Sequence, residues 1–189
     1  MSDHVPPDAM AERWFGAQFA ALHPLLQDVH RRGGCLHGEV SVHTGSGLAG
    51  WLGQRVAWRM GIGVLPERQS WRVHIYHDGA GLHWDRHGAD GLVARSLFVP
   101  VGQWPTGYWL ENTGRLHLKL TVDVINGGWH WRPLALRIGP LWWPAALLPR
   151  VHAFKCIEQG RYRFAVSVHF PLLGRVFGYE GLLVLEDAG

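Results

Sequence analysis

The chain reads RLHLKLTVDVINGGWHWR at residues 115–132, and apolar and polar side chains alternate through the first half of this segment. Leucine and valine occupy the even positions 116–124, whereas polar or charged residues occupy the odd positions 115–123. A period of two predicts a strand with one apolar face and one polar face. Asn126-Gly127 accepts the positive φ angles of a type I′ turn and therefore predicts a hairpin. In the resulting register four pairs face each other: Val124 and Trp129, Val122 and Trp131, Asp123 and His130, and Thr121 and Arg132.

The same period of two recurs from Ser70 onward, with turn residues between the apolar segments. It predicts an antiparallel meander with strands at residues 71–77, 82–86, 93–99, 108–111, 115–125, 129–137, 151–158, 161–170 and 175–185. A short strand is predicted earlier, at residues 35–43. Helical spacing of apolar residues predicts a helix that begins near Asp8 and is interrupted by Pro24, and a second helix over residues 48–60.

Because the helices precede the sheet, the predicted fold class is α+β. We expect a strongly curved antiparallel sheet of seven to nine strands, a half-barrel or lipocalin-like shape, covered by two or three N-terminal helices. Residues 1–8 are predicted to be a disordered tip, and residues 9–189 a single domain. Within it, residues 9–62 form mainly the helical cover and residues 70–186 the sheet.

Composition narrows the functional class. The chain has 189 residues, of which 47% are hydrophobic, enough for one domain with a sizeable core. A net charge of +3 is spread along the chain without a basic run, so no nucleic-acid partner is expected. Cys35 and Cys156 are far apart in sequence and fit neither a disulfide framework nor a zinc site, so we expect no metal and no cofactor. No secretory signal or membrane-length apolar segment is visible, which predicts a cytoplasmic protein.

Several short motifs occur in a characteristic order: residues 30–34, Gly38-Glu39-Val40, residues 48–61, Leu65-Pro66, LWWPAALLP at 141–149, residues 160–164, residues 171–174 and residues 178–181. Together they resemble a bacterial family of unknown function. Its members are free-standing or fused C-terminally to a saccharopine-dehydrogenase-like, NAD(P)-binding oxidoreductase domain. The resemblance implies one domain and a possible oxidoreductase partner, but no particular activity. The chain departs from the family pattern at residues 84–87, WDRH in place of Trp-x-Arg-x-Phe, and at residues 111–114, ENTG in place of Glu-Arg-Gly.

Residues 71–87 concentrate histidine and aspartate side chains. A turn at residues 78–81 places His74 opposite Asp85 and Tyr76 opposite His83. A carboxylate beside an imidazole is typical of an acid/base dyad or a partial metal site, and equally of a solvent-facing cross-strand contact. His74, His83 and Asp85 are therefore the catalytic candidates if the protein is an enzyme, a question that the sequence leaves open.

A second polar row runs across the hairpin and consists of Arg115, His117, Lys119, Asp123, His130 and Arg132. Rows of this kind usually face solvent in antiparallel sheets. If the sheet curls around them instead, they offer a cationic floor for a carboxylate or phosphate group.

The segment at residues 139–149 is too rich in proline for a regular strand. We expect it to fold over an open end of the sheet as a core plug. As alternatives, Trp142 and Trp143 form a ligand lid or a peripheral membrane contact. Farther along, Tyr179 and Glu180 lie on opposite faces of the last strand. Glu180 is either part of a bulge or a pocket acid paired with an arginine.

The leading hypothesis is a binding module whose curved sheet encloses a cavity for a hydrophobic or lipid-like small molecule. Its candidate ligand-binding residues are Arg115, His117, Lys119, Trp129, Trp131, Trp142, Trp143, Tyr179 and Glu180. The first alternative is an acid/base enzyme or an accessory domain of an NAD(P)-dependent oxidoreductase. The second is a structural domain that binds another protein through an exposed aromatic patch.

Overall fold

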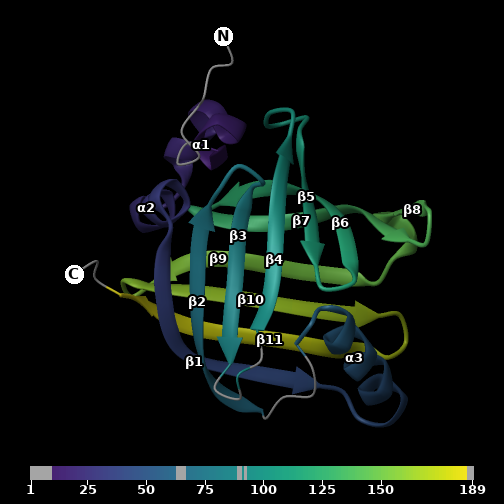
Figure 1. Ribbon diagram of the computed structural model, residues 1–189. Coiled ribbons are helices and arrows are strands. Elements are labelled where there is room, and N and C mark those ends of the chain that lie inside the picture. The colour runs from purple at the N-terminus through teal and green to yellow at the C-terminus, as the bar shows by residue number, and fades with distance from the viewer. Residues whose placement is uncertain (1–9, 63–66, 89–90, 92, 187–189) are drawn as a thin grey trace.

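Figure 1 shows the computed structural model, which describes residues 10–62, 67–88, 91 and 93–186. The tip predicted at residues 1–8, including the helix start at Asp8, lies outside these residues. Most of the described residues belong to strands, and the helices are short and occur at three places along the chain. None of the helices among the described residues is long and apolar enough to cross a membrane.

The strands form one antiparallel sheet that closes on itself. Their order is β6-β5-β4-β3-β2-β1-β11-β10-β9-β7-β8, and β6 also pairs with β7. Ten strands therefore form a closed barrel, and β8 extends from β7 at its side. The bounds are β1 Gly34–Thr44, β2 Arg68–His77, β3 Leu82–Gly88, β4 Val93–Val101, β5 Tyr108–Thr113, β6 Leu116–Ile125, β7 Gly128–Ile138, β8 Leu141–Pro144, β9 Arg150–Glu158, β10 Arg161–Phe170 and β11 Gly174–Leu185.

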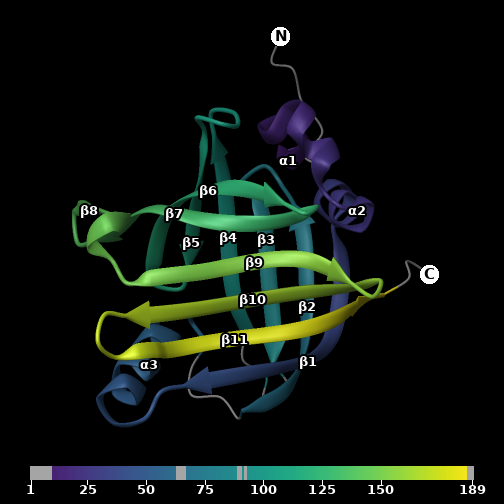
Figure 2. The ribbon, with the colours of Figure 1, turned by 180° about the vertical axis from the view of Figure 1, so that it is seen from behind.

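Closure corrects the predicted half-barrel of seven to nine strands. Two long-range pairings produce it: β1 pairs with β11 from Leu36 to Thr44, and residues 129–131 of β7 pair with β9. A closed barrel satisfies the backbone groups that an open sheet leaves unpaired at its two edges. In Figures 1 and 2, β2, β3 and β4 form one wall, and β9, β10 and β11 run across them on the opposite wall.

The hairpin predicted from residues 115–132 is confirmed in detail. Asn126 and Gly127 adopt φ angles of 50° and 75°. The observed register contains all four predicted pairs, among them Val124 with Trp129 and Val122 with Trp131. The apolar face of β6 points into the barrel, and its polar face points outward.

The N-terminal helices close one end of the barrel. They are α1 (Met10–Phe15), the 3-10 helix η2 (Gly16–Ala21) and α2 (Pro24–Arg32). Pro24 begins α2 rather than only interrupting a helix, because proline needs no hydrogen-bonded N–H at that position. The backbone N–H of His23 donates to the Gly127 carbonyl, which fixes α2 to the β6–β7 turn. Buried rings fill this closed end: Trp14, Phe15, Phe19, Trp109 and Trp129.

The remaining helix, α3 (Gly47–Arg59), lies at the other end of the barrel, beside β11 (Figure 1). Close approach requires a glycine there, since a Cβ on Gly53 would lie 2.0 Å from the Val176 carbonyl oxygen. The Arg115 N–H donates to the carbonyl of Arg59 and ties the end of α3 to the β5–β6 turn. The predicted helices therefore sit at two opposite ends of the barrel and do not cover one face of a sheet.

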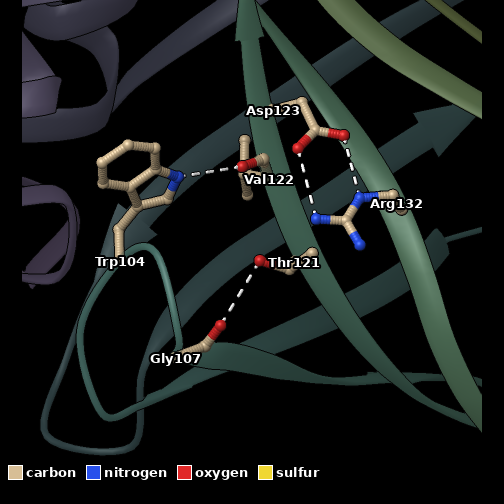
Figure 3. A network of polar contacts seen from close by, with 6 residues as sticks. All are labelled: Trp104, Gly107, Thr121, Val122, Asp123 and Arg132. Carbon is tan, nitrogen blue, oxygen red and sulfur yellow. Dashed lines mark hydrogen bonds and ion pairs between the residues drawn. The ribbon is translucent and has the colours of Figure 1, made fainter.

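The loop between β4 and β5 folds back onto β6 (Figure 3). Trp104 Nε1 donates to the Val122 carbonyl over 3.3 Å, and Thr121 Oγ1 donates to the Gly107 carbonyl over 3.3 Å. Thr121 is thereby buried although its sequence position belongs to the polar face of β6. Asp123, two residues farther along that face, forms an ion pair with Arg132 across the hairpin.

The proline-rich segment differs from the expected core plug. Leu141–Pro144 forms β8, and a 3-10 helix, η3 (Ala145–Leu147), follows it. Leu141 is 61% exposed, and Trp142 and Trp143 are also exposed. β8 pairs with residues 135–138 at the end of β7, and the described residues leave its side chains largely open to solvent. The prediction of a buried plug was therefore wrong.

Candidate functional site

The barrel interior contains a cavity of about 510 Å³. This volume falls within the roughly 300–1,000 Å³ that is usual for small-molecule sites. The walls are mainly apolar, with side chains from most strands of the barrel. They include Leu116, Leu118, Leu120, Phe98, Trp131, Leu136, Ala153, Phe164, Val166, Val168 and Phe170. The alternation that first predicted the sheet thus supplies the surface of the pocket.

The pocket has a mouth and a floor. Its exposed lining residues are Arg55 and Arg59 of α3, Ile138 of β7 and Leu147 of η3. They mark the mouth at the end of the barrel that carries α3. The opposite end is closed by the aromatic cluster under α1 and α2, where Phe15 and Trp129 rings lie 4.8 Å apart in an edge-to-face arrangement.

A lysine lies at the floor. Lys155 of β9 lines the pocket and is 3% exposed. Its Nζ atom is 2.5 Å from His30 Nε2 of α2 and lies over the rings of Trp129 and Trp84, at 4.0 and 4.5 Å from their centroids. Burial, and next the positive charge of Arg86, holds the pKa of Lys155 well below its usual range, although Glu111 acts in the opposite direction.

The orientation of His30 follows from its other contact. His30 Nδ1 lies 2.7 Å from the carbonyl oxygen of Leu26, which only accepts hydrogen bonds. Nδ1 therefore carries the proton, and the lone pair on Nε2 accepts a hydrogen bond from Lys155. Burial lowers the pKa of His30 well below its usual value, and a protonated Lys155 lowers it further. The imidazole is thus held neutral beside the amine.

A second polar group runs along the wall formed by β3, β4 and β5. Arg86 donates from Nη1 to Ser96 Oγ over 2.9 Å, and Ser96 Oγ lies 2.5 Å from Thr113 Oγ1. Thr113 in turn donates to Glu111 Oε1 over 2.5 Å. Burial raises the pKa of Glu111, while the Thr113 hydrogen bond and Arg86 act in the opposite direction. Arg86, Thr113 and Glu111 all line the pocket and give its apolar wall one polar strip.

Tyrosine hydroxyls add to the polar interior. Burial raises the pKa of both Tyr162 and Tyr179, so both stay protonated at neutral pH. The buried Tyr162 hydroxyl has no hydrogen-bond partner among the described residues. A buried hydroxyl without a partner carries a desolvation cost, which a ligand or a water molecule can relieve.

Two of the predicted ligand-binding residues, Trp131 and Tyr179, line the pocket. A third, Trp129, is fully buried in the aromatic cluster below it. Tryptophan and leucine side chains are thus among the residues that line the cavity.

The cationic row of β6 lies outside the barrel, on the solvent-facing side that such rows usually occupy. The Arg115 guanidinium lies over Trp58, and the Lys119 amine over Trp142. His117 forms a hydrogen bond with Asn112. The alternative in which this face lines the cavity is therefore wrong, because the leucines of β6 occupy the inside.

Other predicted ligand residues also lie away from the pocket interior. Trp142 and Trp143 are on the exposed strand β8, next to η3 at the mouth. Glu180 is half-exposed and lies 3.7 Å from both Arg163 and His43. The expected pairing with an arginine is present, but the register irregularity of β10 and β11 is at Val168 and not at Glu180.

The histidine and aspartate candidates have the predicted register but do not line the pocket. His74 pairs with Asp85 and Tyr76 with His83 across β2 and β3. The Tyr76 ring stacks on His83 and its hydroxyl donates to Asp85, while Asp78 contacts His83 and Arg95 contacts Asp85. These side chains have the outward parity of β3, opposite to the pocket residues Trp84 and Arg86. Among the described residues no group of three or more His, Cys, Asp or Glu side chains is placed to hold a metal ion.

Sequence reasoning did not select the polar residues of the pocket. Lys155 is a single charged residue among the alternate positions of β9 that face inward, together with Val151 and Ala153. That position in the alternation is the feature by which the sequence could have identified it. Arg86 and Glu111 belong to the two segments where the chain departs from the family pattern. His30 begins the family motif at residues 30–34, but the motif does not indicate its contact with Lys155, which depends on how α2 packs against β9.

The geometry defines a closed antiparallel β-barrel with an internal apolar pocket, a class compatible with ligand binding. Residues 22–183 match the profile of a family described as "Domain of unknown function (DUF4166)". The chain therefore belongs to the DUF4166 family. The searches of curated proteins and of solved structures found no match to this chain.

Proposed function

We propose that the protein binds a hydrophobic small molecule inside the barrel, with an oxygen-bearing end group directed toward Lys155 and Arg86. The observation that carries this proposal is the 510 Å³ cavity, whose apolar walls are interrupted by a few convergent polar groups. Apolar walls supply affinity through burial of the ligand, and isolated polar groups fix its orientation. The Arg86 guanidinium offers more N–H donors than its hydrogen bond to Ser96 uses.

Entry is proposed through the mouth beside α3, where an anionic membrane surface is the expected source of the ligand. On this helix Trp51 and Trp58 are 52% and 55% exposed. Guanidinium groups lie over both rings: Arg55 over Trp51 and Arg115 over Trp58. Exposed tryptophans beside cations suit the headgroup region of a membrane that carries negative charge. Trp142 and Trp143 of β8 extend the same rim, in line with the peripheral membrane contact that is one of the two alternatives for this segment.

Binding is tested by titrating the protein with 1-decanol and following tryptophan fluorescence, since Trp84 and Trp131 line the pocket. Saturable binding is expected for the wild-type protein. Ala153→Trp fills the cavity between Trp131 and Val166, its partners in the sheet, and should abolish binding. The matched control is Ala165→Trp on neighbouring β10, a residue outside the pocket lining, which should bind as the wild type does. Equal binding by both variants, or none by the wild type, contradicts the proposal.

A further inference from the structure

Lys155 occupies the position of a reactive amine. Lys155 is one of the residues that line the pocket, so a ligand held by the apolar walls lies beside its side chain. The tryptophan rings around the amine exclude bulk water from it. Amines in such apolar surroundings act as nucleophiles toward carbonyl groups, because the neutral form is the reactive one.

His30 supplies a base at bonding distance from that amine. The Leu26 carbonyl fixes the proton on Nδ1, so the free lone pair of Nε2 points at Lys155 Nζ, 2.5 Å away. The imidazole belongs to α2, the helix at the closed end, and approaches the amine from behind the pocket lining. A ligand carbonyl and the base can therefore contact Nζ at the same time.

Opposing effects decide the charge of the amine. The Trp129 and Trp84 rings favour an ammonium ion, because their faces attract a cation. Burying an ammonium without a paired anion opposes this attraction, and the charge of Arg86 adds repulsion. The carboxyl that acts on Lys155, Glu111, already accepts a hydrogen bond from Thr113, and its own pKa is raised by burial. Tyr162 stays protonated and supplies no negative charge. His77 lowers the pKa of His30 when it is charged, so it adds no negative charge either. The balance favours the neutral amine.

We propose that Lys155 forms an imine with an aldehyde or ketone group at the end of a hydrophobic ligand, with His30 as the base. The inference rests on the proposed function, since the ligand must first enter the barrel. The Nζ lone pair attacks the carbonyl carbon, and His30 Nε2 takes a proton from the nitrogen. The imidazolium returns that proton to the oxygen, which gives a carbinolamine. His30 Nε2 then takes the remaining proton from the nitrogen and delivers it to the hydroxyl group as the C–O bond breaks, so the oxygen leaves as water and the imidazole ends neutral. One carbonyl and one amine thus yield one imine and one water, with no net oxidation.

The chain provides its own control, because it contains only two lysines, Lys155 and Lys119. Lys119 lies on the outer face of β6, away from the pocket. The experiment treats the full-length protein with stoichiometric decanal and sodium cyanoborohydride at neutral pH. Peptide mass spectrometry then measures N-decyl groups at both lysines and at the N-terminal amine.

Lys155 should be alkylated at least about tenfold faster than Lys119, since each unit by which a lysine pKa falls gives about tenfold more neutral amine. Lys119→Arg should leave this rate unchanged, Ala153→Trp should block it, and His30→Asn should slow alkylation while decanol still binds. The wild-type comparison of two lysines remains informative even if a variant fails to fold.

The outcomes separate the two proposals. If decanol and decanal bind but Lys155 is alkylated no faster than Lys119, imine formation is overturned and the binding function stands. If neither compound binds the wild-type barrel, the proposed function itself is overturned. Alkylation of Lys155 that persists in Ala153→Trp would mean that the reaction does not use the pocket, and it would also overturn the inference.

Discussion

Acid should destabilise this protein through His30. The imidazole is fully buried and its pKa in the folded protein lies well below the ordinary value, mainly because burial disfavours the charged form. In the unfolded chain His30 takes up a proton near pH 6.5. Below that pH the unfolded state binds a proton that the folded state does not, so the free energy of unfolding falls as pH falls.

The magnitude follows from linkage. One proton of difference lowers the free energy of unfolding by up to about 1.4 kcal/mol for each pH unit. The loss begins near pH 6.5 and continues down to the pKa of the folded state. Lys155 changes the stability in the same direction, but over a higher pH range. Because its pKa is lowered in the folded protein, the free energy of unfolding falls as pH falls below the ordinary lysine pKa of about 10.4.

Urea denaturation at intervals between pH 7.5 and pH 5 measures this slope for the wild-type protein, for His30→Leu and for His152→Gln. His30→Leu removes hydrogen bonds to Lys155 and Leu26 and should be less stable at pH 7.5, so the slope and not the absolute stability is the readout. We expect His30→Leu to have the flatter slope by up to about 1.4 kcal/mol per pH unit. His152 is exposed, and its variant should follow the wild type. Identical slopes for the wild type and His30→Leu would refute the reasoning.

Three further changes test the architecture by thermal unfolding. Gly53→Ala gains up to about 1 kcal/mol of helix propensity, but the new Cβ clashes with the Val176 carbonyl. The expected net result is a loss of about 1–3 kcal/mol in the free energy of unfolding. The control Gln54→Ala, at an exposed position of the same helix, should leave the stability unchanged. Gly127→Val should cost about 1–2 kcal/mol, since residue 127 has a φ of 75°, and an unchanged melting temperature would argue against the turn. Asp123→Ala should cost less than about 1 kcal/mol, because the ion pair with Arg132 is about half-exposed, and a larger loss would show that this pair does more than its geometry predicts.

Local alternation predicted most of the sheet because it depends only on neighbouring residues. The β6–β7 register followed from parity and the Asn126-Gly127 turn, and the β2–β3 register followed in the same way from the turn at residues 78–81. Closure was not predictable, since it requires pairing between β1 and β11, which lie at opposite ends of the chain. The alternation within a strand does not predict which distant strand will pair with its edge.

The candidate site was predicted only in part, for a related reason. Parity placed Trp131 and the leucines of β6 on the apolar face, and they do line the pocket. The same parity also selected polar rows such as the one that contains Arg115. Such rows are common because they usually face water. The charged group that matters most to the pocket is a single inward residue, Lys155, and its partner His30 comes from a helix 125 residues away in sequence. A single charged residue at an inward-facing position hardly changes the alternation of a strand. Its contacts can therefore be recognised only in the folded barrel.

A crystal structure of the protein grown with 1-decanol examines the interior of the barrel itself. The account predicts continuous density for the chain between β6 and β10, beside Leu118 and Val166, with its hydroxyl toward Lys155 or Arg86. A barrel whose own side chains fill this space, with decanol absent or bound only outside, would contradict it.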